Sequence, residues 1–496
     1  MISAFANTWR VPELRDRILF TLALIVIVRL GVHATLPGVD ATVIKEWLKM
    51  QVDQQGNNPA AAVGTLLTVF SGGGLQQCGI FALGIMPYIS ASIMVQLMSA
   101  VVPKLARLAR EDGGRQKLNQ YTRYLTICIA LIQGVMLVQS LKTPGQLFYL
   151  SGIEKVGRPL VPVPSVEWVL LSVLTIVAGT ILLMWIGDQI TERGIGNGVS
   201  LIITVNIVHA LPGALVLAWK TFVGGVDPSP FRALILVLLI AFLLFVIAGV
   251  IAITQGQRRI AIQYAKRVVG RKMFGGQTQY LPLKVNYAGV MPIIFASAVL
   301  SLPAMAIQMI FRNSAWATKL QTAMSPGSPW YYVIAGTMIF FFSYFWVATM
   351  FQPSQIAEDL KRGGGYIPGV RPGKPTGEFL DFTMSRLTFA GAIFLTGLFI
   401  LPMLLTSWFQ LPHLVTQFFG GTSVLIVVGV LLDVMRQVET HLLQRHYDGF
   451  LRKGRLKGRY DRLQSTGRAA TTTAIVYLWV FIAVIVLVAV AAWIYQ

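Results

Sequence analysis

Residues that could catalyse a reaction or hold a cofactor are few in this chain, and they are not grouped. Residues 194–198 and 373–374 look like pieces of phosphate-binding loops. However, the first stretch follows a predicted helix, and the second lacks the upstream glycine of such a loop. The five histidines are scattered, and Cys78 and Cys128 have neither metal-ligand nor disulfide-framework spacing. The sequence therefore predicts no cofactor, no metal site and no enzymatic activity.

Polar side chains inside apolar stretches are the next candidates. A proton- or sodium-coupled transporter needs ionisable groups within the membrane, whereas Asp188 and Asp433 fall at the ends of apolar stretches. Gln96, Gln133 and Asn206 lie inside such stretches, where amides most often form hydrogen bonds between helices. A polar seam that can open is the alternative. Any transport is therefore expected to draw its energy from a partner.

The elements that position these residues are long apolar runs. Hydrophobic residues make up 55% of the chain and charged residues 12%, about half the charged fraction of a soluble domain. Runs of about twenty residues can each cross a membrane as a helix. We expect ten or eleven crossings, at residues 18–36, 78–100, 122–141, 166–186, 199–219, 232–254, 287–311, 331–351, 387–407, 414–435 and 473–494.

The net charge of +21 is distributed unevenly. If the N-terminus is cytoplasmic, the connections on that side hold most of the 41 Lys and Arg residues, which is the positive-inside pattern. Residues 10–17 are polar and lead into the first span without a small-residue cleavage site, which indicates a retained N-terminus. The sequence thus predicts a multi-pass membrane protein whose basic loops are cytoplasmic.

Three connections are unusually long. The outward connection 37–77 contains an apolar stretch, residues 63–70, which is too short to cross and precedes Gly72-Gly73-Gly74. It is either a half-helix that dips into the membrane or a surface helix with a flexible hinge. The inward connections 255–286 and 352–386 are basic or rich in Gly and Pro. Orientation and anionic lipid explain their charge, but docking of a large cytoplasmic partner better explains their length.

An internal repeat divides the chain into two halves. Residues 84–92 and 289–297 share the pattern G-x-M-P-x-I-x-A-S, in the second and the seventh predicted spans. These are equivalent positions in two sets of five spans, and an odd number of spans per set gives the sets opposite orientations. The repeat therefore predicts an inverted-repeat architecture, which usually encloses a central pathway.

Longer motifs resemble the SecY family of protein translocase channels over residues 10–460. They occur in the family's order, at residues 70–74 with 84–92, 191–198, 281–286, 369–373 and 420–423. The resemblance implies an all-α membrane protein with two inverted five-helix halves around a central pore and a re-entrant plug half-helix. The chain departs from the family after the tenth span, where an apolar run at 474–495 is long enough to form an extra C-terminal transmembrane helix. The expected units are 1–220 with the plug at 63–77, 221–440, a basic cytoplasmic segment at 441–471 and the extra helix at 472–496.

The resemblance also assigns roles that the residues alone leave open, since isoleucine stripes usually face lipid or pack. An apolar pore ring fits a chain of any sequence and resists water when narrow. The resemblance implies that this ring consists of Ile85, Ile89, Ile203, Ile207, Ile294 and Ile426. It implies a plug and hinge that include Phe70, Ser71, Gly72, Gly73 and Gly74. It implies a lateral gate at Ser90, Gln96, Gln133 and Leu302.

The implied function is a protein-conducting channel in a bacterial plasma membrane that passes unfolded secretory proteins and releases membrane helices into lipid. The implied partners are small SecE and SecG type subunits, the SecA motor ATPase, the ribosome and signal peptides. Partner contacts are expected at Arg258, Arg259, Lys266, Arg267 and Arg371. A secondary transporter of small solutes and a lipid-processing enzyme are the alternatives. The segment after residue 471 is either a lone lipid anchor or a helix packed on the channel's periphery.

Overall fold

The computed structural model describes most of the helical body of the chain. The described residues are 11–44, 46–47, 71–111, 113–142, 153–222, 230–264, 267–269, 272–274, 278–297, 299–300, 320, 323, 328–409, 415–416, 418 and 421–452. The segment expected to form the body of the plug, residues 63–70, and the predicted eleventh span lie outside this part of the chain.

The N-terminal half is built from helices whose starts are visible in the sequence. Proline stands in the first turn of three of them, where its missing N–H leaves no hydrogen bond unmade. Ser165 caps another by accepting a hydrogen bond from the Trp168 amide at 3.2 Å. The helices are α2 (Pro12–His33), α5 (Met86–Val101), α6 (Pro103–Arg110), α7 (Gly114–Leu141), α8 (Val166–Arg193) and α9 (Gly198–Phe222).

The C-terminal half repeats this helical plan. Its helices are α10 (Pro230–Gln255), a helix that starts at Met291, α13 (Pro329–Met350), α14 (Pro353–Arg362), α15 (Lys374–Phe409) and α17 (Thr422–Arg452). Among the described residues, six helices are long and apolar enough to cross a membrane by length and composition. Helices α2, α5 and α17 occupy the first, second and tenth predicted spans. The predicted helical membrane architecture is confirmed.

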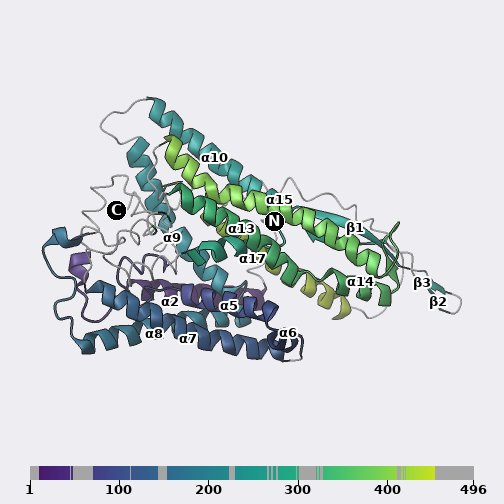
Figure 1. Cartoon of the computed structure of the whole chain (residues 1–496), viewed down its shortest axis with the longest axis horizontal. Helices are drawn as coiled ribbons and strands as arrows, with labels where there is room; N and C mark the ends of the chain where they lie inside the picture. The colour runs from purple at the N-terminus through teal and green to yellow at the C-terminus, as the bar shows by residue number, and fades with distance from the viewer. Residues whose placement is uncertain are drawn as a thin grey trace.

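The helices of each half pack against one another, and the halves meet at α9 and α17. Helix α7 packs against α5 and α8, α13 packs along α15, and α9 contacts α17. Figure 1 shows α2, α5, α7 and α8 as one layer, with α10, α13 and α15 forming a second layer across it. One buried cluster combines residues of α2, α5, α8 and α9 with residues of the C-terminal half. The core at this junction is therefore shared by both halves.

Several predicted boundaries are wrong, and local backbone conformation explains why. The second span was expected from residue 78, but residues 72–85 form turns and an isolated bridge, so α5 begins only at Met86. The tenth span was expected over 414–435, whereas α17 begins at Thr422 and continues to Arg452. The start of the predicted basic segment, residue 441, therefore lies inside a helix that extends beyond the apolar stretch.

The expectation of an all-α protein needs one correction, because the long inward connections form a sheet. Strand β1 (Gln257–Tyr264) pairs antiparallel with β4 (Thr278–Lys284) and with β5 (Gly365–Tyr366), giving the order β4-β1-β5. Beyond them, β2 (Arg267–Val269) pairs with β3 (Lys272–Phe274). Figure 1 shows these strands projecting at one end of the helical body.

Candidate functional site

The two copies of the sequence repeat adopt the same local structure. Gly84 and Gly289 have positive φ angles of 57° and 64°, a region that favours glycine. Each lies two residues before the start of a helix, at Met86 and at Met291. The sequence similarity therefore reflects a repeated way of entering the second helix of each half. It places Ile89 and Ile294 at equivalent positions.

A second, weaker repeat relates the last helix of each half. Residues 198–205 and 421–428 share the pattern G-x-S-x-x-I-x-V, which makes Ile203 equivalent to Ile426. The same alignment pairs Ile207 with Val430, and both belong to one buried cluster. Val430 was not expected at the site. This repeat is the sequence signal from which Val430 could have been predicted.

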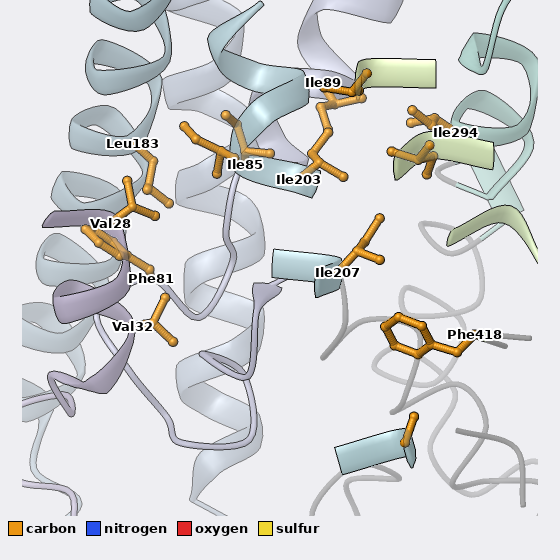
Figure 2. Packing of buried hydrophobic residues seen from close by; sticks show 14 of the residues in the cluster. Val28, Val32, Phe81, Ile85, Ile89, Leu183, Ile203, Ile207, Ile294 and Phe418 are labelled. Carbon is orange, nitrogen blue, oxygen red and sulfur yellow. The ribbon is translucent and has the colours of Figure 1, made fainter. Parts of the chain in front are cut away.

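All six isoleucines of the implied pore ring belong to that one cluster. Their exposed fractions run from 1% for Ile207 and Ile426 to 7% for Ile89. Figure 2 shows Ile85 and Ile89 at the start of α5, and Ile203 and Ile294 directed toward a common space, with Ile207 between them and Phe418. Side chains buried to this degree fill the space between the halves and do not line an open passage. No feature of the sequence pointed to Phe418.

The glycine hinge is packed against the helical body. Ser71, Gly72 and Gly74 are buried, and the Ser71 hydroxyl accepts a hydrogen bond from the Leu75 amide at 3.2 Å. Gly72 and Gly73 have φ angles of 65° and 91°. A Cβ atom at Gly74 would lie 2.9 Å from the Phe81 carbonyl oxygen. Glycine is thus required here by turn geometry and close packing. Phe70 lies outside the described residues.

The residues of the implied lateral gate are only partly described. Ser90 and Gln133 are buried, at 6% and 8% exposure. Gln96 is exposed, and its amide nitrogen donates to the Ser92 hydroxyl one turn earlier at 3.1 Å. Helices α5 and α7, which carry these residues, pack along each other. Leu302, which is expected on the opposite side of the gate, lies outside the described part of the chain.

Three of the five expected partner contacts lie on one folded unit, which we call the cytoplasmic platform: strands β1, β4 and β5 with the turn at residues 367–373. Arg258, Arg259 and Arg371 are exposed on it. The Tyr366 hydroxyl donates to Gln263 Oε1 at 3.0 Å, beside the backbone pairing of β1 with β5. The Arg371 carbonyl accepts from the Thr376 hydroxyl at 2.8 Å, which fixes the turn. Lys266 and the side chain of Arg267 are outside the described residues.

The motif at residues 191–198 has a structural role. The Gly198 amide donates to the Thr191 hydroxyl at 2.9 Å, and the Ile195 amide donates to the Thr21 hydroxyl of α2 at 3.2 Å. The Gly196 amide donates to Gln437 Oε1 of α17 at 2.7 Å. The turn between α8 and α9 therefore connects the first helix to the last helix that the structure describes. It does not form a nucleotide loop.

Comparisons with known proteins agree with this architecture. Two solved structures share the fold: "The structure of a protein conducting channel" (TM-score 0.53, 16% identity, 89% of this chain and 94% of that chain) and "Sec61 in the Canine ribosome-channel complex from the endoplasmic reticulum" (TM-score 0.51, 15% identity, 89% and 94%). At these identities the likeness shows the fold alone.

Sequence relatives are much more similar. A protein translocase subunit SecY of Chlamydia trachomatis is 40% identical over 467 residues, 92% of this chain and 100% of the relative. Those of Streptomyces galbus and Aquifex aeolicus are 42% and 41% identical, over 91% and 90% of this chain and 100% and 98% of the relative. The family model described as SecY matches residues 79–435. The chain belongs to the SecY family.

Proposed function

We propose that this chain forms the protein-conducting channel of a bacterial Sec translocase in the plasma membrane. It passes unfolded secretory polypeptides across the bilayer and releases membrane-protein helices sideways into lipid. The observation that carries the proposal is the meeting of six isoleucines from both halves in one buried cluster. The full-length relatives are named translocase subunits. That naming gives the small-solute transporter no support.

The apolar cluster suits a channel that must be sealed at rest and unselective in use. Branched aliphatic side chains offer no hydrogen bond to a passing chain, so they do not hold any particular sequence. While buried against one another they exclude water and ions. An incoming polypeptide would separate the helices that carry them. The gate positions Ser90, Gln96, Gln133 and Leu302 would then mark the seam through which a helix leaves.

The plug is expected to seal the channel next to the isoleucine cluster. A hinge at Gly72 to Gly74 is supported by the burial of Gly72 and Gly74 and by the series of turns that connects them to α5. Residues 63–70 would form the moving body. Movement of this body requires a change at the hinge, where Gly72 and Gly73 already adopt conformations that other residues reach only with strain.

Partners supply the energy, and the chain itself performs no catalysis in this proposal. The relatives are named as subunits, which supports assembly with further subunits of SecE and SecG type. The similar Sec61 was solved in a ribosome-channel complex, which supports the ribosome as a partner. The exposed arginines of the cytoplasmic platform suit a polyanionic ribosomal surface and would make docking sensitive to salt. The SecA motor would use the same platform, with Arg371 as its main contact.

Site-specific crosslinking of a stalled precursor tests the channel. We would place a cysteine at Ile294 (Ile294→Cys) in a Cys128→Ser background, because Cys128 is exposed and Cys78 is buried. The channel is assembled with its partner subunits and motor in vesicles. A secretory precursor with a thiol-reactive group in its mature part is then stalled. We expect a crosslink only during energised translocation.

The control variant carries its cysteine on the outer surface of α8 instead (Leu170→Cys), where the Leu170 side chain is 64% exposed. It should not react with the mature part of the precursor. A precursor that is transported without ever crosslinking at Ile294, or at Ile89 in a parallel variant, would contradict the proposal.

A further inference from the structure

An arginine side chain lies within the first membrane-spanning helix, where a charged group is costly and usually functional. Arg29 is on α2, in the last quarter of the helix counted from its cytoplasmic end. Its Nη1 donates to the carbonyl oxygen of Gly72 and to Oδ1 of Asn206, each at 3.3 Å. One guanidinium thus joins the first helix, the glycine hinge and helix α9.

The surroundings leave little freedom at this junction. A Cβ atom at Gly72 would lie 2.6 Å from Arg29 Nη1 and closer still to Asn206 Oδ1. Arg29 Nη2 is buried and has no hydrogen-bond partner among the described residues. One turn further along both helices, His33 and His209 stack edge to face with ring centroids 6.4 Å apart. Helices α2 and α9 therefore make two polar contacts one turn apart, Arg29 with Asn206 and His33 with His209. Of these two, only the Arg29 contact also includes the glycine hinge.

Asn206 connects this junction to the isoleucine cluster. It lies between Ile203 and Ile207 on α9 and is 3% exposed. If a polypeptide pushes the helix carrying these isoleucines aside, the acceptor amide moves with it. Arg29 would then lose one of its two acceptors, and its hold on the Gly72 carbonyl would weaken. Both bonds are long for bonds that involve a charged donor, so they are weak enough to release.

We propose that Arg29 and Asn206 are positioning residues that hold the glycine hinge against α2 and α9 in the resting channel until α9 is displaced. We call the three residues, Arg29, Gly72 and Asn206, the Arg29 latch. This inference rests on the proposed channel function. It adds a specific link between the glycine hinge and helix α9, which carries Ile203 and Ile207. The latch has no counterpart in the other half, where the residue equivalent to Asn206 is Gly429.

Ion leak through the resting channel reports whether the Arg29 latch keeps the channel closed. We would reconstitute the complete complex in vesicles and record potassium efflux without precursor, for the unaltered chain, Arg29→Gln, Asn206→Ala and the double variant. Each single variant should raise the leak about tenfold, the ratio expected when one hydrogen bond to a charged group is lost from the closed state. The double variant should leak no more than the leakier single variant, because both changes break the same latch.

Two further variants separate positioning from general damage. Arg29→Lys keeps the charge on a single donor nitrogen but loses the planar fork of the guanidinium, so its leak should fall between those of the unaltered chain and Arg29→Gln. Thr175→Val removes a hydroxyl that donates within its own helix, to the Leu171 carbonyl, and should leave the leak unchanged. If Arg29→Gln fails to assemble, Asn206→Ala, which removes no charge, decides the outcome alone.

The outcomes also separate the latch from the channel. If the unaltered complex does not translocate a precursor, the channel proposal fails. If it translocates normally but the single variants leak no more than Thr175→Val, or if the double variant multiplies the two single effects, the latch is wrong and the channel stands.

Discussion

The two halves of this protein enter their second helix in the same way, down to the backbone contacts. Gly179 on α8, at the fourth predicted span, approaches the Ile80 carbonyl, four residues before Gly84. Gly391 on α15, at the ninth predicted span, approaches the Val285 carbonyl, four residues before Gly289. A Cβ atom at these two glycines would lie 2.5 Å and 2.8 Å from the respective carbonyl oxygens. The repeated frame is therefore held by close backbone packing, which needs glycine on both sides.

The halves differ in what they attach to this frame. In the first half the connection before the second helix faces outward and ends in the glycine hinge, with Arg29 and Asn206 against it. In the second half the corresponding connection is cytoplasmic and forms β1 and β4 of the platform. Helix α10 carries no charged residue between residues 233 and 255, and Gly429 replaces the asparagine. The two halves thus share one frame, and each carries a different element on the side that its orientation exposes.

The largest expected effect tests the shared frame. Gly179→Ala and Gly391→Ala should each destabilise the protein by about 1–3 kcal/mol, because the added methyl group forces a backbone segment away. Thermal unfolding of the complex in detergent measures the loss. As matched controls, Gly134→Ala and Gly397→Ala introduce a methyl group with nothing closer than 3.8 Å. Equal losses at tested and control positions would show that helix packing, and not the paired carbonyl contacts, holds the frame.

A smaller effect is expected from charge on the platform. Arg258→Glu combined with Arg371→Glu should weaken ribosome binding roughly tenfold at low salt and reduce its salt dependence, because fewer phosphate contacts form. The control is Lys104→Glu combined with Arg107→Glu on α6, two exposed basic residues on the cytoplasmic side of the first half. Cosedimentation with ribosomes over a salt series measures both. If the α6 pair weakens ribosome binding as much as the platform pair, docking is not specific to the platform of the second half.

The smallest effect concerns the asymmetry between Asn206 and Gly429. A Cβ atom at Gly429 would meet Val290 Cγ1 at 3.6 Å, an ordinary contact. Gly429→Ala should therefore change the free energy of unfolding by no more than about 1 kcal/mol, with alanine favoured by helix propensity. It should not raise the resting ion leak. A leak as large as that of Asn206→Ala would mean that both ring helices seal the channel by packing alone, without a latch.

Much of the fold could be predicted from the sequence because it depends on local pattern. Runs of apolar residues placed the helices, and the repeated G-x-M-P-x-I-x-A-S motif related the two halves. The resemblance supplied the six isoleucines, which the structure gathers in one cluster. The start of α5 could not be predicted from hydrophobicity, because residues 78–85 are apolar but turn. Cys78 and Gly84 have positive φ angles there, and these depend on tertiary packing.

The sequence by itself determined the membrane class, the orientation, the two halves and the family. Each of these follows from composition, charge or motifs that are read within short stretches of chain. Only the tertiary structure decided that strands β1 and β5, about a hundred residues apart, pair into one platform, and that Arg29 reaches both Gly72 and Asn206. Such contacts join residues 43 to 177 positions apart. They are set by how helices pack, which no local pattern records.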